Sequence, residues 1–346
     1  MEYRKLGRTG LDVSLICLGT MTWGRQNTEK QGHEQMDYAL EQGVNFFDTA
    51  EMYAVPPTPE TYGKTEEIIG TWFAKTGNRD KVILASKIAG PALPWIRGGN
   101  CKIDRKNITQ ALEDSLKRLQ SDYIDLYQLH WPNRGSYHFS QHWDYAPKFD
   151  VSAVEDNFLE VLETLDGFIK EGKIRHIGLS NETAWGTMKW LRMAEEKGLP
   201  RMASIQNEYS ILCRLFDTDM GEIAIHEECG LLAWSPLGGG LISGKYIDGV
   251  RPKGTRWHIE GRFLPRDTQG SNEAVKAYMA LAESHNLDVC QMALAFVNSR
   301  PFVTSNIIGA TSMEQLKTNI ASVDLKLSPE IMDGIAQLYK KYPMVY

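Results

Sequence analysis

The strongest constraint on the fold is an alternation of short apolar runs with longer amphipathic segments along nearly all 346 residues. The apolar runs have the length of strands, whereas the longer segments carry apolar residues at helical spacing, as Met36, Ala39 and Leu40 do. The predicted strands are 15–18, 44–47, 82–85, 123–129, 174–179, 203–206, 230–234 and 303–308. The predicted helices are 33–43, 65–75, 107–119, 154–171, 184–197, 219–229, 273–285, 289–300, 312–321 and a terminal helix that begins at 328–329.

Repeated strand–helix units build a parallel sheet. Eight such units, with no composition break or flexible linker between them, predict an α/β fold of the eight-stranded parallel (β/α)8 TIM barrel class. We expect a single domain that spans residues 1–346. Segments 1–5 and 11–14 precede the first unit and predict a β-hairpin at the bottom of the barrel.

Composition excludes several classes of protein. The net charge of −6 and the absence of a basic stripe argue against nucleic-acid binding. No run approaches the roughly 18 apolar residues that span a bilayer, and residues 1–15 hold no apolar run of signal-peptide length, so we expect no membrane insertion. The five cysteines are scattered without a CxxC pair, which argues against a disulfide framework or a zinc site and favours a reducing, cytoplasmic setting. The oligomeric state stays open, a homo-oligomer included.

Four of the predicted strands lead into residues that are suited to acid–base chemistry. Asp48 follows the second strand with Tyr53 five residues later, Lys87 follows the third strand, and His130 follows the fourth. Active sites of such barrels lie at the carboxyl ends of the strands, so these side chains are expected to meet there. None of the four residue types is specific alone; their joint placement on consecutive strand ends makes them the candidate catalytic group.

This set suits the reduction of a carbonyl group, in which an acid must protonate the oxygen as hydride reaches the carbon. A phenol has a pKa near 10, and an adjacent ammonium stabilises its phenolate. Tyr53 is therefore the expected proton donor, with Lys87 and Asp48 tuning it and His130 orienting the carbonyl.

Seven sequence motifs then carry a resemblance to a known family. They are LGTMTWG at 18–24, FDTAEMY at 47–53, SK at 86–87, DLYQLHWP at 125–132, GKIRHIGLSN at 172–181, QNEYS at 206–210 and SPLGGGLISGKY at 235–246. In this order and spacing the chain resembles the aldo-keto reductase superfamily from about residue 3 to residue 323. Within it, the chain is similar to the branch that holds potassium-channel β-subunits and the Tas-like reductases.

The resemblance implies an NADPH/NADP+ cofactor and a small carbonyl substrate, an aldehyde or a ketone. It also implies a set of cofactor-binding positions at the strand ends and in the loops that follow them. These positions are Gly19, Thr20, Met21, Ser180, Asn181, Gln206, Tyr209, Trp234, Ser235, Pro236, Leu237, Gly239, Lys245, Arg256, Ile308, Gly309, Thr311, Gln315 and Asn319.

The implied roles divide these positions by the part of the cofactor that they bind. Ser180, Asn181 and Gln206 hold the nicotinamide amide, and Tyr209 stacks on its ring. The pyrophosphate is assigned to Ser235, Leu237 and Lys245. The adenosine phosphate is assigned to Gly309, Thr311, Gln315 and Asn319. Arg256 is the expected partner of the 2′-phosphate, with Arg262 and Lys317 as the next candidates. Thr318 stands where some relatives carry an acidic residue, which leaves the choice between NADP and NAD open.

Other signals have less support. Residues 239–245 fit GxxxxGK, but Tyr246 follows where a phosphate-binding loop has Ser or Thr, and no strand leads into GxGxxG. His138 and His142 have helical metal-ligand spacing but lie in a predicted loop without a third ligand, so no metal site is expected. The same insertion, 133–152, continues the aromatic cluster that Trp131 begins, and this cluster is expected to wall an apolar pocket for a small or medium aldehyde, aromatic and α-dicarbonyl compounds included.

Two rival functions stay open. One is an NADPH-sensing regulatory subunit that keeps the fold and binds a membrane protein, as channel β-subunits do. The other is a barrel hydrolase or isomerase that uses Asp48 and Glu51 as its two carboxylates, which predicts no NADPH binding.

Overall fold

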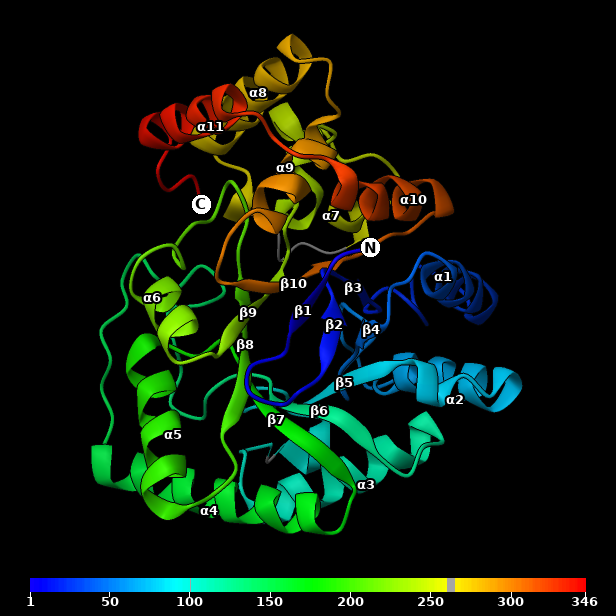
Figure 1. Ribbon diagram of the computed structural model, residues 1–346, viewed down its shortest axis with the longest axis vertical. Coiled ribbons are helices and arrows are strands. Elements are labelled where there is room, and N and C mark those ends of the chain that lie inside the picture. The colour runs from blue at the N-terminus through cyan, green and yellow to red at the C-terminus, as the bar shows by residue number, and fades with distance from the viewer. Residues whose placement is uncertain (100, 260–264) are drawn as a thin grey trace.

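The computed structural model describes residues 1–99, 101–259 and 265–346. Within these residues eight parallel strands close into a barrel in the order β10-β3-β4-β5-β6-β7-β8-β9 (Figure 1). The strands are β3 (Ile16–Gly19), β4 (Phe46–Asp48), β5 (Ile83–Ile88), β6 (Ile124–Leu129), β7 (Ile174–Ser180), β8 (Met202–Glu208), β9 (Gly230–Trp234) and β10 (Val303–Ile308). The predicted TIM barrel is therefore confirmed.

Helices surround the barrel and follow its strands along the chain (Figure 1). They are α1 (Glu29–Glu41), α2 (Lys64–Thr76), α3 (Arg105–Leu119), α4 (Val151–Lys170), α5 (Ala184–Lys197), α6 (Asp219–His226), α7 (Arg256–Ile259), α8 (Gln269–Ser284), α9 (Val289–Asn298), α10 (Met313–Ala321) and α11 (Pro329–Lys341). The long insertions 54–63 and 133–152 have little regular structure, while the described part of 237–269 holds short helical turns and α7.

Helix α1 begins four residues before its predicted start at residue 33. Its N-cap is Thr28, whose side chain accepts from the backbone of Gln31 while the Gln31 side chain accepts from the Thr28 backbone. This reciprocal capping box satisfies two donors of the first turn that otherwise lack intrahelical partners. The start was predicted too late because apolar periodicity begins only after the cap.

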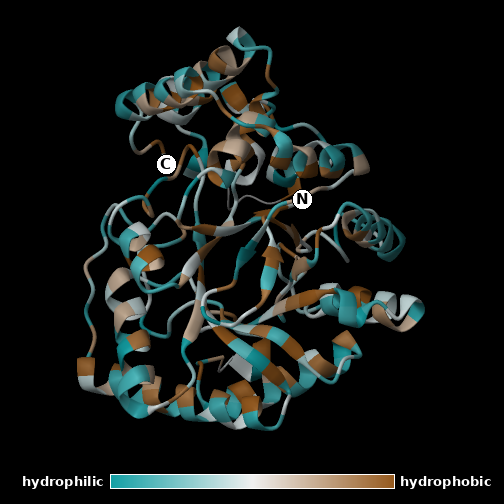
Figure 2. Ribbon diagram, viewed as in Figure 1, coloured by the Kyte–Doolittle hydropathy of each residue, from teal (hydrophilic) through white to brown (hydrophobic). Residues whose placement is uncertain are grey.

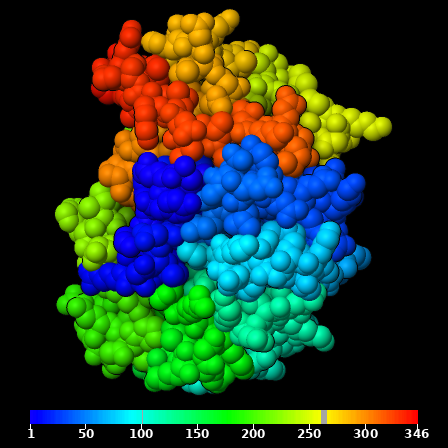
Figure 3. Space-filling view, turned by 45° about the vertical axis from the view of Figure 1, so that its right-hand side comes forward, coloured from blue at the N-terminus to red at the C-terminus, as the bar shows by residue number. Residues whose placement is uncertain are grey.

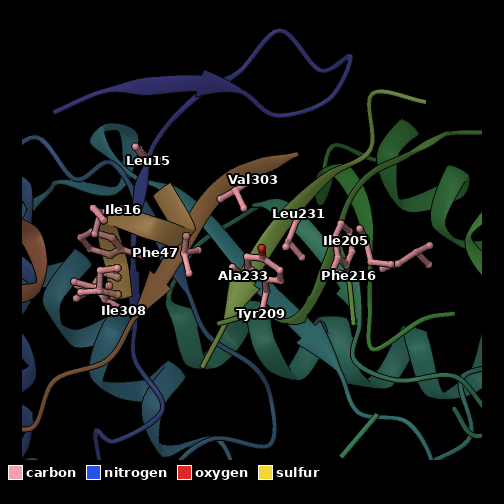
Figure 4. Packing of buried hydrophobic residues seen from close by; sticks show 14 of the residues in the cluster. Leu15, Ile16, Phe47, Ile205, Tyr209, Phe216, Leu231, Ala233, Val303 and Ile308 are labelled. Atoms are coloured by element: carbon pink, nitrogen blue, oxygen red, sulfur yellow. The ribbon is translucent and has the colours of Figure 1, made fainter. Parts of the chain in front are cut away.

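Among the described residues, two of the apolar clusters pack on the two faces of the barrel sheet. The larger lies between the strands and the surrounding helices, and Figure 4 shows part of it, with Phe47, Leu231 and Ile308 among the labelled side chains. In Figure 2 many barrel strands are brown, whereas the helices carry both brown and teal residues, as expected for elements with one buried face. The smaller core fills the barrel interior and includes Leu126 and Leu232.

The N-terminal hairpin closes one end of this interior. Strands β1 (Tyr3–Lys5) and β2 (Asp12–Ser14) pair antiparallel, as predicted. Leu6 and Val13 of the hairpin are fully buried in the interior core. Figure 3 shows the hairpin in dark blue on the molecular surface, next to the C-terminal helices in red and orange. The plugged end is opposite the carboxyl ends of the strands, where the candidate site lies.

None of the helices described is long and apolar enough to cross a membrane.

Candidate active site

Strand register brings the polar strand ends to one level. Gly19 pairs with Asp48 across β3 and β4, Lys87 pairs with Gln128 across β5 and β6, and Ser180 pairs with Gln206 across β7 and β8. Parallel pairing of this kind places residues from distant parts of the chain around one rim. The predicted catalytic residues meet at this rim.

Lys87 is the centre of the cluster and is fully buried. Its Nζ donates to Asp48 Oδ2 at 2.7 Å, to the Thr49 carbonyl at 2.7 Å and to Tyr53 Oη at 3.3 Å. An ammonium has three N–H donors, so these three acceptors match its full capacity. Lys87 thus holds Tyr53 in place and has no donor left for a substrate.

Charge balance keeps Lys87 protonated. Burial alone would lower its pKa, but attraction to the Asp48 carboxylate, and to a lesser extent to the Tyr53 oxygen, raises the pKa above its ordinary value. The same attraction favours the Tyr53 phenolate, because the interaction between the ammonium and the phenol oxygen is mutual. The pair therefore supports loss of a proton from Tyr53.

Asp48 is fixed by more than its ion pair. Its Oδ1 accepts from Gln206 Nε2 at 2.8 Å and from Gln128 Nε2 at 3.3 Å, and Gln206 Nε2 also contacts Gln128 Oε1 at 3.2 Å. Gln128 was not predicted as a site residue, although it lies in the DLYQLHWP motif two residues before His130. Its inward position on β6 is the signal that strand alternation could have supplied.

Tyr53 and His130 form the accessible side of the cluster. Their rings meet edge to face with centroids 5.9 Å apart, and each residue keeps a small exposed fraction, 8% and 7%. The His130 backbone donates to the Ile88 carbonyl at 3.0 Å, and its own carbonyl accepts from Asn181 Nδ2 at 2.9 Å. A carbonyl that reaches this edge meets the phenol and the imidazole together.

Glu51 does not take part as a second catalytic carboxylate. It is fully buried, and its oxygens accept from the Ala89 backbone at 2.7 Å, from Tyr62 Oη at 2.8 Å and from Arg97 Nη1 at 2.6 Å. These bonds tie the 54–63 insertion to the end of β5, just beyond Lys87. The arrangement speaks against the two-carboxylate hydrolase or isomerase.

The residues assigned to the nicotinamide amide lie together at the ends of β7 and β8. Ser180 Oγ donates to the Gln206 carbonyl at 2.8 Å, and Asn181 Nδ2 contacts Ser180 Oγ at 3.1 Å. Trp234 Nε1, at the end of β9, donates to Asn181 Oδ1 at 3.2 Å, and its ring is only half-buried. The rim thus presents amides and one accessible indole.

The expected stacking of Tyr209 on the cofactor is wrong. Its ring is fully buried in the outer core, edge to face with Phe302 at 5.3 Å, and its hydroxyl donates to Asp217 Oδ1 at 2.6 Å. Figure 4 shows Tyr209 beside Leu231 and Ala233 in this core. Tyr209 directly follows the end of β8, where strand alternation no longer sets the direction of a side chain. Trp234 is a more accessible aromatic ring near these positions.

The glycine-rich turn after β9 leaves its backbone open. Gly238, Gly239 and Gly240 all have positive φ, which residues with a Cβ rarely adopt. Gly239 accepts at its carbonyl from Trp257 Nε1 at 3.2 Å, and the exposed Lys245 lies beside Gly240. A bare backbone next to an ammonium fits a pyrophosphate.

The other positions of this turn and its loop are placed as follows. Ser235 has positive φ, and Pro236 and Leu237 lead from it into the glycine turn. Arg256 opens α7 and is half-buried. Arg262 lies outside the described residues.

The positions assigned to the adenosine phosphate surround the start of α10. Ser312 is its N-cap and accepts from the Gln315 backbone. Gln315 Oε1 accepts from the Thr311 backbone at 3.0 Å, and Asn319 Nδ2 donates to the Gly309 carbonyl at 3.1 Å. The helix N-terminus favours a negative charge at this place.

The remaining positions lie at the ends of the neighbouring strands β3 and β10. Thr20 is buried with its hydroxyl on the Asp48 carbonyl at 2.8 Å, whereas Met21 is half-buried. Ile308 packs in the outer core, so only its backbone can serve a ligand.

The aromatic insertion lies beside this mouth. Phe139 stacks on Trp234 with ring centroids 5.9 Å apart and meets Trp131 edge to face at 6.4 Å. Trp131 in turn lies 4.8 Å from His130, centroid to centroid. No three side chains of His, Cys, Asp or Glu within the described ranges are grouped so as to hold a metal ion.

Comparison with known proteins identifies the family of the chain. The model of the aldo/keto reductase family matches residues 15–340. The chain is 46% identical over 344 residues to Protein tas of Escherichia coli (strain K12), with 99% of each chain covered. It is 35% identical over 356 residues to Uncharacterized oxidoreductase YrpG of Bacillus subtilis (strain 168), covering 98% of this chain and 96% of the relative.

A third relative carries a different kind of name. The chain is 29% identical over 357 residues to the Probable voltage-gated potassium channel subunit beta of Arabidopsis thaliana, covering 99% and 98% of the two chains. All three alignments span nearly the full length of both partners, so the shared features include the whole barrel. The chain therefore belongs to the aldo/keto reductase family and is an oxidoreductase.

Proposed function

We propose that the protein reduces aldehydes and ketones to alcohols with NADPH. The observation that carries this proposal is the buried Lys87 ammonium that contacts both Asp48 and the Tyr53 phenol. Bound NADPH supplies hydride to the carbonyl carbon. The protein must then provide a proton for the oxygen and hold the carbonyl in place.

Tyr53 donates that proton. As the substrate oxygen gains negative charge, the O–H bond of Tyr53 breaks and the proton passes to this oxygen, leaving a phenolate and an alcohol. Lys87 stabilises the phenolate from 3.3 Å, and Asp48 keeps Lys87 in position. A fixed charge in a site that excludes water acts more strongly than the same charge in solution.

His130 orients the carbonyl. Its ring meets Tyr53 edge to face, so a carbonyl oxygen placed against the phenol also lies near the imidazole. The hydrogen bond from Asn181 to the His130 backbone links this residue to the nicotinamide side of the mouth.

The preference for NADPH is assigned to Arg256. The protein is acidic overall, with a net charge of −6, so attraction for the 2′-phosphate must be local. Arg256 lies in the same loop as the glycine turn 238–240, and the N-terminus of α10 adds a favourable dipole at the adenosine end. These features fit an NADP(H) molecule that extends from the glycine turn to the N-terminus of α10.

We assign small and medium aldehydes as substrates, aromatic and α-dicarbonyl compounds among them. Trp131, Phe139 and Trp234 form a connected set of rings beside His130. A panel of carbonyl compounds assayed with NADPH tests this assignment. Activity confined to sugar phosphates would contradict it.

A regulatory role is the second candidate, because the Arabidopsis relative is named as a probable channel subunit. The buried group of Asp48, Tyr53, Lys87 and His130 does not by itself distinguish an enzyme from a regulatory subunit that senses the cofactor. Steady turnover of aldehydes would favour the enzyme, whereas tight NADPH binding without turnover would favour the sensor.

The decisive variant is Tyr53→Phe. It removes the proton donor and one acceptor of Lys87 while keeping the ring, so we expect a loss of at least about a hundredfold in kcat. NADPH affinity, measured by fluorescence titration, should change little. Tyr3→Phe, in the hairpin at the opposite end of the barrel, is the matched control. Near-normal reduction by Tyr53→Phe would refute the assignment.

A further inference from the structure

A hollow lies beside the catalytic mouth. The tip of the aromatic insertion, the end of β8 and the side chain of Tyr346 line it. Phe139 belongs to its wall and also stacks on Trp234, so the hollow lies next to the aromatic cluster beside the mouth.

Asn207 presents a hydrogen-bond acceptor there. The residue is 1% exposed, and its Nδ2 donates to the Glu182 carbonyl at 3.0 Å. A carbonyl only accepts, so this bond fixes which end of the amide is nitrogen. Asn207 Oδ1 is therefore an acceptor, and it has no hydrogen-bond partner among the residues described.

His142 presents a second acceptor. Burial lowers its pKa, and a hydrogen bond with the backbone of Tyr346 opposes this effect in part, so the ring is neutral at pH 7. A bond that favours the protonated form is one that the ring donates. The atom Nε2 is buried without a partner in the described structure, and in the tautomer that carries its hydrogen on Nδ1 it presents a lone pair.

The opposite wall is also built from acceptors. Glu208 Oε1 accepts from Arg266 Nη2 at 2.8 Å and from Tyr346 Oη at 3.3 Å. Arg266 balances the charge of this carboxylate, and the hydroxyl hydrogen of Tyr346 points to Glu208. A second anion in the hollow would meet the carboxylate and two lone pairs, whereas a neutral hydroxyl could donate to them.

We propose that this hollow is a distal substrate subsite that selects uncharged carbonyl compounds bearing a hydroxyl group remote from the carbonyl. The inference rests on the proposed reductase activity for its biological meaning. Its physical basis does not depend on that activity. A buried acceptor without a donor is energetically unfavourable, and a hydrogen bond from a substrate hydroxyl removes this cost. Asn207 and His142 are then specificity residues that act on binding, with no part in proton transfer.

Matched substrates isolate the hydroxyl group. The first pair is 4-(hydroxymethyl)benzaldehyde and 4-ethylbenzaldehyde, and the longer pair is 4-(3-hydroxypropoxy)benzaldehyde and 4-butoxybenzaldehyde. Within each pair a terminal CH3 replaces OH, so shape is nearly constant. One neutral hydrogen bond predicts roughly a three- to tenfold preference in kcat/KM for the hydroxylated member of at least one pair.

Variants assign the effect to the hollow. His142→Phe keeps a ring but removes Nε2, and Asn207→Leu removes Oδ1; each should reduce the preference, mainly through KM. Phe139→Leu changes an apolar wall and should affect both members of a pair alike. Thermal unfolding and NADPH titration show whether each variant remains folded and binds the cofactor.

Binding to the Tyr53→Phe protein loaded with NADP+ gives a readout without turnover. Calorimetric titration should show tighter binding of the hydroxylated aldehyde, and the His142→Phe change should reduce the difference. If no carbonyl compound is turned over by the wild type but this difference persists, the reductase proposal fails and the subsite stands. Equal affinities within both pairs would overturn the subsite, as would preferential reduction of 4-formylbenzoate, which would assign Arg266 to a substrate carboxylate.

Discussion

The ion pair between Lys87 and Asp48 gives the sharpest test of the catalytic cluster as a physical unit. The two side chains are 0% and 3% exposed, and Nζ lies 2.7 Å from Oδ2. Replacing Lys87 by Met keeps much of the chain volume but leaves the carboxylate without its cation. Breaking a buried pair from one side typically costs about 3–5 kcal/mol.

The structure predicts that the cost of Lys87→Met lies at the lower end of this range. Asp48 retains two amide donors, Gln206 at 2.8 Å and Gln128 at 3.3 Å, so Lys87→Met should lower the free energy of unfolding by about 3 kcal/mol. Asp48→Asn alone should cost a similar amount, because the buried ammonium then lacks its counter-charge. The double variant buries neither charge and should cost about 3 kcal/mol rather than the sum, a coupling of about 3 kcal/mol.

Urea unfolding followed by the fluorescence of the nine tryptophans measures these differences. The control is Lys30→Met, which removes a surface ion pair to Glu34 at 3.9 Å from a lysine side chain that is 86% exposed. It should cost less than about 0.5 kcal/mol, since exposed pairs contribute little. A cost below about 1 kcal/mol for Lys87→Met, or additive costs in the double variant, would refute the reasoning.

Three further predictions concern the cofactor and the aromatic insertion. Calorimetry should show that Arg256→Ala weakens NADPH binding roughly ten- to a hundredfold and leaves NADH binding unchanged. Equal losses of affinity for the two cofactors would mean that another residue contacts the 2′-phosphate, and Lys317 is the next described candidate. Trp234→Ala should weaken both cofactors, whereas Tyr209→Phe should leave both affinities unchanged; the reverse result would restore the original stacking assignment. Burial lowers the pKa of His138 from 6.5 to about 4. Between these pH values the unfolded chain therefore binds a proton that the folded chain does not. The free energy of unfolding should fall as the pH drops from 6.5 to 4. Urea midpoints of His138→Gln should show a shallower decline over this window, and an unchanged slope would contradict the prediction.

Much of the fold could be predicted because local patterns and tertiary packing agree. Helix α5 and strands β9 and β10 have the predicted bounds, and α11 begins at the predicted proline. Parallel strands also explain why the catalytic group could be predicted. Once Asp48, Lys87 and His130 are each placed just at or beyond a strand end, closure of the barrel brings them to one rim.

The site was less predictable wherever side-chain direction matters. Tyr209 lies beyond the last residue of β8, and its ring turns into the outer core instead of the mouth. The residue types of Gln128 and Glu51 did not reveal their roles, because amides and carboxylates near strand ends serve many purposes. Their roles depend on partners 80 and 38 positions away in the chain.

The sequence by itself determined the number of strand–helix units, the hairpin before them and which residue types stand at the strand ends, since periodicity and turn residues are local properties. Only the tertiary structure decided how those residues are paired. The three bonds of Lys87, the burial of Tyr209 and the acceptor wall formed by Asn207 and His142 all join segments that are distant in the chain. Hydrogen bonds act over about 3 Å, so such contacts exist only after the barrel has closed.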